Sequence, residues 1–315
     1  MWGKSERQVN RLFNETMNGI GESRHNDKQL SRELGAESFR DVAKLTSIYS
    51  HGTADTYLPY WKNLVDFSNK NKGIKDVEKI TNRAVKEFLQ LKIREVNCNS
   101  TFRKISSAIL KMEESLNRYS IQNDTNNRYN WQKIVDNARV VSRSKLAKSI
   151  VGRGFEDCKD IINHLPKSNE DHILVSKIQM EAGIRVYEAC LIKSSQLKGI
   201  GKDPYSSKEA GVLLIKGKGG KMREVYLSPS TYKELEKRVE DKELKVGITS
   251  YTKAIKHAAY RSGQSYTGTH DFRHSWVQNR YKEVSGLGYS DSQILASISE
   301  EIGHVRPDIT EIYLR

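Results

Sequence analysis

The sequence has 315 residues, of which 37% are hydrophobic and 29% are charged. This composition is typical of a folded protein with a charged surface, it excludes a disordered or fibrous chain, and the length predicts two domains. The 53 Lys and Arg residues outnumber the 39 Asp and Glu residues by 14, which favours a polyanionic partner, most often nucleic acid.

Targeting signals are missing from the sequence. No apolar run approaches the ~20 residues that a membrane helix needs, and the start, MWGKSERQVNR, lacks the apolar core of a signal peptide. Cys98, Cys158 and Cys190 lie far apart, which argues against a disulfide framework or a CxxC zinc site. We therefore expect a cytoplasmic protein with no membrane partner.

Residues 1–38 are polar, with nearly balanced charges and Leu12 and Phe13 as rare apolar residues. We interpret them as a loosely attached N-terminal arm. Residues 39–122 show helical periodicity instead, and Thr53 is a plausible N-cap for the first clear helix. Three stripes at three- and four-residue steps predict a small helical bundle: Ala54, Tyr57, Leu58, Trp61, Leu64 and Val65; Ile80, Ala84, Val85, Phe88 and Leu89; Phe102, Ile105, Ile109, Met112 and Leu116.

Residues 123–150 are predicted to be a basic linker. The turn-prone segment NDTNN (123–127) opens it, and residues 128–153 then contain seven bases and one acid, Asp136. Such a run is either a solvated face or a surface that binds a nucleic-acid backbone. The bases are Arg128, Lys133, Arg139, Arg143, Lys145, Lys148 and Arg153.

Residues 151–315 form the second predicted domain. GFEDCKDIINHL and VSKIQMEAGIRVYEACLIK predict helices, AGVLLIKGKGGKMREVYLS alternates as a β-hairpin around a glycine-rich turn, and helices follow to the end. The expected fold class is mostly α with a small β-hairpin or sheet.

Candidate chemistry gathers in this second domain. HExxH, GxSxG and GxxxxGK[ST] motifs are absent, and no spaced carboxylates beside a histidine suggest a two-metal nuclease. The sequence offers instead a set of cations and one tyrosine: Arg185, Lys218, His270, Arg273, His304 and Tyr313.

This set suits a phosphodiester. Two arginines can hold the non-bridging oxygens, a lysine on a flexible turn can protonate a leaving oxygen, and histidines can hydrogen-bond the phosphate or accept a proton. A tyrosine hydroxyl, whose reference pKa is about 10, is a poor nucleophile that needs such a cationic setting. Together these groups could cleave DNA without a metal.

At these residues the sequence resembles the tyrosine recombinases, or phage integrases. Arg185 in EAGIRVYEA matches the first family arginine, and Glu188 matches the acidic residue three positions later. Lys218 in GKGGKMREV matches the hairpin lysine. HDFRH supplies HxxR as His270 and Arg273, IGH supplies His304, and Tyr313 follows nine residues later. The resemblance covers roughly residue 154 to the end, and more weakly 39–119.

The resemblance implies a helical core-binding (SAM-like) DNA-binding domain at 39–122 and an α+β catalytic domain at 151–315, closing on duplex DNA as a C-shaped clamp. It implies that Tyr313 attacks the scissile phosphate to form a 3′-phosphotyrosyl bond, that Arg185 and Arg273 clamp the phosphate, that Lys218 is the general acid, and that His270 and His304 assist. No cofactor, metal or ATP is expected. The hairpin bases expected to touch DNA are Lys216, Lys221 and Arg223.

The implied partners are double-stranded recombination sites, a homotetramer assembled on DNA from free monomers through a Holliday junction, and an accessory bending or directionality factor. We expect a prophage or mobile-element integrase at the bacterial nucleoid. The long His270–His304 interval, with SGLGYSDSQ, is similar to a proteobacterial prophage-integrase subgroup. The sequence ends two residues after Tyr313, where many family members continue into a helix that packs on a neighbouring subunit.

Several alternatives stay open. A type IB topoisomerase uses similar groups, a non-catalytic DNA-binding regulator would retain only the binding surface, and a chromosome-dimer resolvase is a close cousin. Arg185 could merely pair with Glu188, and His270 and His274 could bind a metal, although no third ligand is near. Tyr313 could act in its own subunit or in a neighbour.

Overall fold

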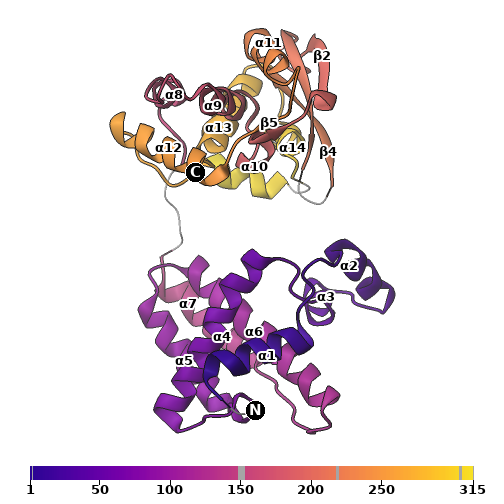
Figure 1. Cartoon of the computed structure of the whole chain (residues 1–315), viewed down its shortest axis with the longest axis vertical. Helices are drawn as coiled ribbons and strands as arrows, with labels where there is room; N and C mark the ends of the chain where they lie inside the picture. Colours follow the sequence, from indigo (N-terminus) through magenta and orange to yellow (C-terminus); the bar gives the residue numbers. More distant parts are fainter. Residues whose placement is uncertain (2, 148–152, 218–219, 305–306, 315) are drawn as a thin grey trace. The chain divides into compact units, whose positions relative to one another are not determined.

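The computed structural model describes residues 1, 3–147, 153–217, 220–304 and 307–314, without the side chains of 307–309. The chain divides into two compact units, Met1–Ile150 and Val151–Arg315 (Figure 1). Unit 1 is helical and contains α1 (Ser5–Thr16), α2 (Arg24–Glu33), α3 (Phe39–Leu45), α4 (His51–Lys72), the 3-10 turn η1 (Val77–Lys79), α5 (Asn82–Glu95), α6 (Asn99–Gln122) and α7 (Gln132–Lys145).

Unit 2 combines helices with two small sheets. Its elements are α8 (Cys158–Asn163), α9 (Glu170–Ala182), α10 (Val186–Ala189), β1 (Leu191–Ile192), η2 (Ser194–Gln196), β2 (Leu197–Lys202), β3 (Glu209–Lys216), β4 (Met222–Leu227), α11 (Pro229–Arg238), β5 (Leu244–Lys245), α12 (Ile248–Arg261), α13 (Asp271–Ser285), α14 (Asp291–Glu301) and η3 (Pro307–Leu314). The predicted fold class, mostly α with a small sheet, is therefore confirmed.

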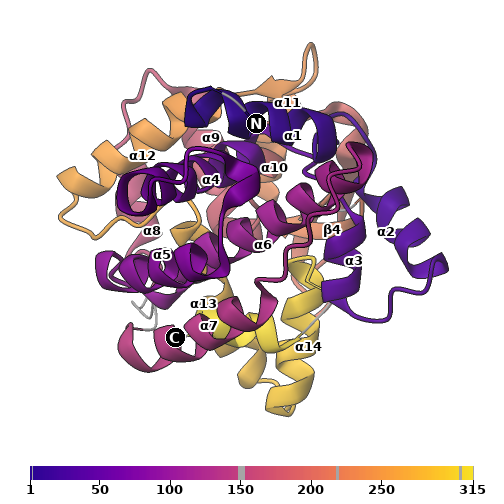
Figure 2. The ribbon, with the colours of Figure 1, turned by 90° about the horizontal axis from the view of Figure 1, so that it is seen from below.

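Helices α4, α5, α6 and α7 build the bundle of unit 1 around the predicted apolar stripes (Figure 2). Trp61 is fully buried, and its indole Nε1 donates a hydrogen bond of 2.8 Å to the carbonyl of Ala108 across the core. Helix α4 begins two residues before the predicted cap, because Ser50 Oγ accepts the backbone N–H of Thr53 at 3.2 Å and so caps the helix itself.

The prediction of a loosely attached arm over 1–38 is wrong for α1. Val9, Leu12 and Phe13 are buried in the core of unit 1, and the hydroxyl oxygens of Thr16 and Ser115 lie 2.5 Å apart. The apolar residues of α1 recur at three- and four-residue steps, so one face of this polar helix packs on α4 and α6. Helices α2 and α3 lie at the edge of the unit in both views (Figures 1 and 2).

The prediction that 123–150 is a linker is wrong for α7. Trp131 and Val135 are fully buried in unit 1, and Ala138 is buried beside them. A carboxylate oxygen of Glu113 on α6 accepts the backbone N–H of Trp131 at 2.5 Å, which fixes the start of the helix. The basic side chains of α7 therefore project from a packed helix of the bundle.

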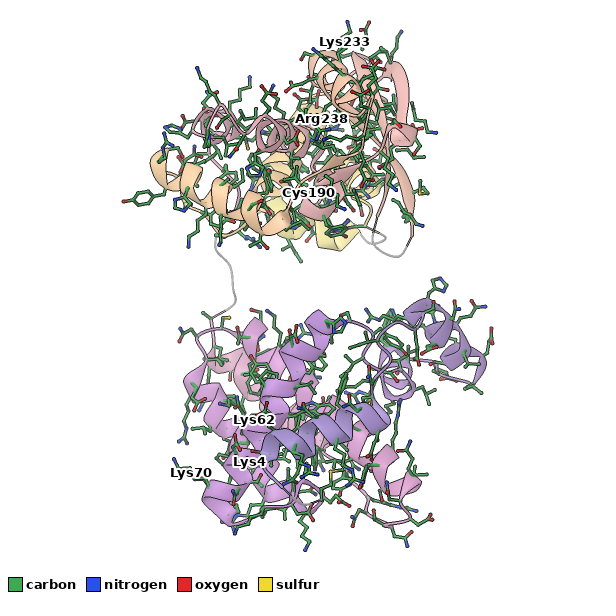
Figure 3. The ribbon with its side chains drawn as sticks, in the orientation of Figure 1. Lys4, Lys62, Lys70, Cys190, Lys233 and Arg238 are labelled. Carbon is green, nitrogen blue, oxygen red and sulfur yellow. The ribbon has the colours of Figure 1, made fainter. Side chains whose placement is uncertain are left out.

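The predicted β-hairpin is confirmed as β3 and β4, and β2 adds a third antiparallel strand in the order β2-β3-β4. Helix α11 packs on this sheet at Gly211, where an added Cβ would lie 2.1 Å from the ring of Tyr232. A second pairing joins β1 to β5. Buried residues such as Ile178, Leu213 and Tyr251 join the sheets and helices into one core, in which Cys190 also lies (Figure 3).

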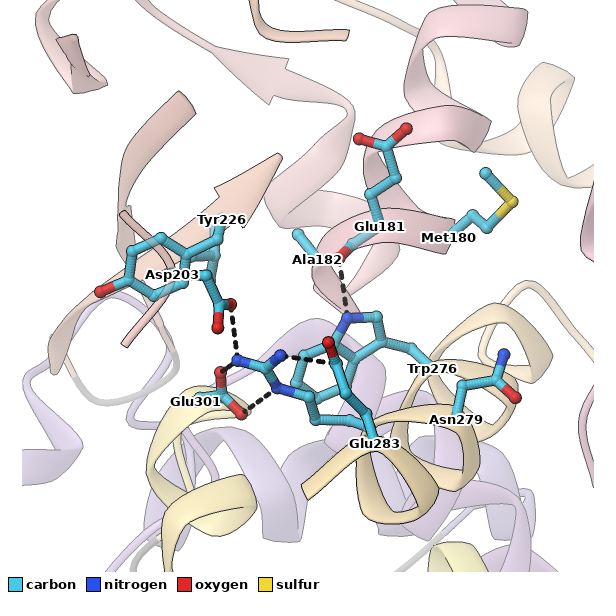
Figure 4. Close-up of a pocket in the computed structure, with 11 residues that line it drawn as sticks. Met180, Glu181, Ala182, Asp203, Tyr226, Trp276, Asn279, Glu283 and Glu301 are labelled. Atoms are coloured by element: carbon cyan, nitrogen blue, oxygen red, sulfur yellow. Dashed lines mark hydrogen bonds and ion pairs between the residues drawn. The ribbon is translucent and has the colours of Figure 1, made fainter. Parts of the chain in front are cut away.

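A separate apolar cluster joins α13, α14 and η3, and it includes Tyr313. Beside it, Arg280 of α13 makes ion pairs of 2.7 Å with Asp203, Glu283 and Glu301 at a small pocket of about 200 Å³ (Figure 4). Since ion pairs offset the cost of burying the Arg280 charge, this cluster ties the β2–β3 turn to α13 and α14.

Candidate active site

The segment before α13 holds His270 in a defined turn. A carboxylate oxygen of Asp271, which is 1% exposed, accepts the backbone N–H groups of Thr267 and Gly268 at 2.6 and 3.0 Å. Gly268 has φ +149°, a conformation that L side chains rarely adopt. The turn therefore fixes a half-buried His270 at the start of α13, and one helical turn later Arg273 lies in the interior of unit 2.

Arg273 is fully buried, and its hydrogen bonds within the described part of the chain include no carboxylate. Its guanidinium donates to the carbonyls of Gly183 at 2.9 Å and Ile302 at 2.5 Å, and it lies 3.3 Å from Nε2 of His304. Nε has no partner within the described residues. Burial lowers the pKa of Arg273 to about 10, so the group stays protonated at neutral pH. A buried cation with an unused donor suits an anionic ligand.

Tyr313 reaches this cation from η3. It is 7% exposed, and its hydroxyl oxygen lies 3.1 Å from Nε2 of His270. Its ring centroid lies 4.5 Å from that of His274 and 5.7 Å from that of His304, with Cζ of Arg273 also 5.7 Å away. Within this chain, η3 therefore places the Tyr313 hydroxyl beside His270.

All three histidines are uncharged at neutral pH. Burial, followed by repulsion from Arg273, lowers the pKa of His270 to about 3 and that of His304 to about 4. Burial, followed by the charge of Arg153, lowers the pKa of His274 to about 4. A neutral imidazole has one ring nitrogen free to accept a proton, and His270 Nε2 is the nitrogen that faces Tyr313.

Arg185 stands at the start of α10, where its guanidinium Nη1 lies 3.1 Å from Glu188, and its backbone N–H donates to the same carboxylate at 2.8 Å. The pairing with Glu188 that the sequence allowed is therefore present. Arg185 still acts on the site, because its positive charge contributes to lowering the pKa of both His270 and His304.

Arg223, predicted to contact DNA, is instead buried. Its guanidinium lies 2.7 Å from Glu188, and its Nε donates to the carbonyl of Glu301 at 2.9 Å. The prediction is wrong because a carboxylate from α10 neutralises the arginine inside the unit. Lys218 and Lys148 lie outside the described residues, whereas Lys216 and Lys221 are exposed beside the hairpin turn.

The Arg153 side chain packs on unit 2. Its Nε donates a hydrogen bond to Thr267 Oγ1 at 2.8 Å and lies 3.4 Å from a carboxylate oxygen of Asp271. Arg139 is half-buried and donates to Ser106 and Ser107, so neither base has the open position of a linker residue. The other predicted bases of this stretch, Arg128, Lys133, Arg143 and Lys145, are exposed on unit 1.

A groove of about 910 Å³ runs between α5 and α7 of unit 1. Its apolar lining includes Ile93, Ala138 and Val141. Its polar lining is basic or amidic: Asn82, Lys86, Gln90, Arg94, Asn130, Lys133, Asn137 and Lys145. Sequence reasoning missed Lys86 and Arg94. The four-residue spacing of Asn82, Lys86, Gln90 and Arg94 beside the buried stripe of α5 was the available signal.

The described residues contain no group of three or more His, Cys, Asp or Glu side chains that could hold a metal ion. The rings of His270 and His274 lie 5.5 Å apart. Within the same residues, no helix is long and apolar enough to cross a membrane.

No protein-family model matches the chain, and no curated protein matches it. Solved structures do. The XerH site-specific recombinase bound to a palindromic difH substrate, in a post-cleavage complex, has a TM-score of 0.62 and 16% identity over 99% of this chain and 90% of its own. A lambda integrase tetramer bound to a Holliday junction has a TM-score of 0.54 and 13% identity, covering 95% and 79%.

The Tn1549 transposon integrase with transposon right end DNA has a TM-score of 0.51 and 10% identity, covering 93% and 95%. These proteins are tyrosine recombinases and integrases, which supports the resemblance drawn from the motifs. At such low identity the likeness establishes the fold: this chain has the fold that they share.

Proposed function

We propose that this protein is a site-specific DNA recombinase of the tyrosine type, which cuts and rejoins duplex DNA through a 3′-phosphotyrosyl link at Tyr313. The observation that supports this most directly is the approach of the Tyr313 hydroxyl to His270 Nε2, at 3.1 Å, beside the buried Arg273 with its unused Nε. A nucleophile, a proton acceptor and an anion-binding cation thus share one small site.

In the proposed reaction the Tyr313 oxygen attacks phosphorus while the bond from phosphorus to the 5′ oxygen breaks. The hydroxyl proton passes to Nε2 of His270, the ring nitrogen that faces the Tyr313 hydroxyl. Lys218 supplies the proton that the leaving 5′ oxygen takes up; this role rests on the family motif alone. One proton is lost from Tyr313, one is gained by the 5′ hydroxyl, and the phosphodiester energy is stored in the new bond.

The arginines hold the phosphate. Arg273 has a buried Nε without a hydrogen-bond partner in the described residues, and Arg185 adds a second guanidinium. In the proposed reaction both bind non-bridging oxygens, whose charge grows in the transition state. His304, 3.3 Å from Arg273, can hydrogen-bond the same phosphate. The reaction needs no metal in this scheme.

The DNA duplex would also occupy the α5–α7 groove of unit 1. Lys86, Arg94, Lys133 and Lys145 supply phosphate contacts there, and Gln90 and Asn137 lie between them with side chains able to pair with adenine edges. By analogy with the lambda integrase tetramer on a Holliday junction, we expect a tetramer on two sites, with accessory factors supplied by the host or element.

The test is covalent trapping. The protein and a Tyr313→Phe variant are incubated in EDTA with a library of nicked duplexes, and denaturant-resistant adducts are isolated and sequenced. An adduct from the parent protein alone supports the proposal and identifies the site. Adducts of equal yield from the Phe variant would show a different nucleophile, and salt-sensitive binding without any adduct would favour a DNA-binding regulator. Relaxation of arbitrary supercoiled plasmids would favour a type IB topoisomerase.

A further inference from the structure

Arg223 is a buried arginine outside the set of groups that the proposed chemistry uses. It lies on β4, five residues after Lys218 in the sequence, and only 5% of its side chain is exposed. Nη2 donates to Oε2 of Glu188 at 2.7 Å, Nη1 approaches Oε1 at 3.4 Å, and Nε donates to the carbonyl of Glu301 at 2.9 Å. The guanidinium therefore spans α10 and the end of α14.

Glu188 is shared between two arginines. One carboxylate oxygen lies 3.1 Å from Arg185 Nη1, while the other accepts the Arg185 backbone N–H and the Arg223 guanidinium. Burial alone would raise the pKa of Glu188, but the hydrogen bond and charge of Arg223, followed by contacts with Arg185, lower it overall. Since Arg223 supplies much of the neutralising charge, the Arg185 guanidinium does not have to satisfy the carboxylate alone.

Two glycines pack directly against Arg223. A Cβ at Gly217 would lie 2.7 Å from Nη1, and a Cβ at Gly303, where φ is +70°, would lie 3.2 Å from Cδ and Nη1. Gly217 precedes Lys218 in the hairpin, and Gly303 precedes His304. Each glycine that packs against Arg223 is thus followed directly in the sequence by a residue of the proposed site.

We propose that Arg223 is a positioning residue: it holds Glu188 so that Arg185 stays free for phosphate, and it fixes the Glu301–Gly303 turn that presents His304. This role rests on the proposed function, and it adds a residue that touches neither substrate nor nucleophile.

The test compares Arg223→Met and Arg223→Lys with Arg238→Met in the full chain. Arg238 is a matched control because it forms an arginine–carboxylate pair with Asp171, at 2.6 and 2.9 Å, on the surface of the same unit (Figure 3). Two readouts are made: the single-turnover rate of adduct formation on the nicked duplex captured from the library, at saturating protein, and the affinity of the free protein for inorganic vanadate by calorimetry.

We expect Arg223→Met to slow adduct formation at least tenfold and to weaken vanadate binding at least threefold, with the DNA dissociation constant within threefold of the parent value. Arg223→Lys retains the charge but cannot span Glu188 and Glu301 together, so it should recover part of the rate with a parent-like urea midpoint. If Arg223→Met does not fold, the rate and the vanadate affinity of Arg223→Lys test the positioning role instead.

Parent-like rates and vanadate affinity in both Arg223 variants would overturn the positioning role. The positioning role would also be overturned if Arg223→Met lowered the rate and the vanadate affinity no more than Arg238→Met does. It would be overturned as well if only the DNA dissociation constant changed. The parent protein could form no adduct and still bind vanadate in a way that depends on Arg223. That outcome would support the positioning role and overturn the proposed function. A parent protein that neither binds vanadate nor forms an adduct would remove both.

Discussion

The hydroxyl oxygen of Tyr313 lies 3.1 Å from Nε2 of His270, although 43 residues separate them in the chain. Tyr313 is held there from behind, because its backbone carbonyl accepts a hydrogen bond of 3.0 Å from Gln278 Nε2 on α13. His270 precedes the first residue of the same helix. One helix therefore fixes both partners.

Replacing His270 with Gln should slow adduct formation at Tyr313 by about 10² to 10³-fold, since the amide can hydrogen-bond the hydroxyl but cannot take its proton. The measurement is the single-turnover rate on a nicked duplex at saturating protein. His257→Gln, on the exposed face of α12, is the matched control and should leave the rate unchanged. An unaltered rate in His270→Gln would mean that another group accepts the proton.

Arg273→Lys should abolish detectable adduct formation while the DNA dissociation constant changes by less than about tenfold. A lysine keeps the charge but cannot reach the carbonyls of Gly183 and Ile302 and still direct a donor into the site. Filter binding and covalent trapping on the same duplex separate the two effects. Retention of most of the cleavage rate by the Lys variant would show that the fork geometry is dispensable.

Acidification should destabilise unit 2. Unfolded histidines bind protons below about pH 6.5, whereas folded His270, His274 and His304 do so only near pH 3 to 4, so the unfolded state gains protons first and stability falls between those limits. His274 is 4% exposed, and its contribution lowers the free energy of unfolding by at most about 1.4 kcal/mol for each pH unit of acidification.

The check is urea unfolding followed by far-UV circular dichroism at pH 7.0 and 5.0. The transition of unit 2 should shift to lower urea at pH 5.0, and His274→Gln should reduce the shift. A transition that is insensitive to pH over this range, or more stable in acid, would contradict neutral buried histidines.

Lys86→Gln and Arg94→Gln should each weaken DNA binding and reduce the slope of log affinity against log salt concentration by about one, because each removes one phosphate contact and its counterion release. Binding is measured by fluorescence anisotropy from 50 to 300 mM KCl. Lys70→Gln on α4, which is exposed but does not line the groove, is the control (Figure 3). Equal slopes in all variants would show that the duplex does not bind in this groove.

Gly211→Ala should destabilise unit 2 by about 1–3 kcal/mol, because the added Cβ would meet the Tyr232 ring at 2.1 Å and one of the two must move. Urea unfolding measures this change. Gly199→Ala, at a glycine of the neighbouring strand β2 with no atom within 4 Å of an added Cβ, tests the separate cost of its positive φ.

Local patterns predicted much of the fold. The stripes of α4, α5 and α6 and the alternation of β3 and β4 follow from which face of each element must leave water, and this information lies within a few turns of sequence. The apolar residues of α1 and α7 follow the same helical spacing. In α1, however, Val9, Leu12 and Phe13 are surrounded by polar residues. In α7 the many basic residues around Val135 and Ala138 suggested a linker. Their partners on α4, α5 and α6 could not be read from those segments.

The sequence by itself determined the types and order of the candidate site residues, because a motif is a property of the chain. Only the tertiary structure decided which basic side chains belong to the candidate site and which are neutralised by carboxylates inside unit 2. Arg223 and Glu188 are 35 residues apart, and their pairing buries a base that looked exposed. Arg273 lies among carbonyls and imidazoles, and its Nε has no hydrogen-bond partner in the part of the chain that the structure describes. The difference arises because a buried charge is controlled by the groups that the fold brings within a few ångströms, and these are rarely neighbours in sequence.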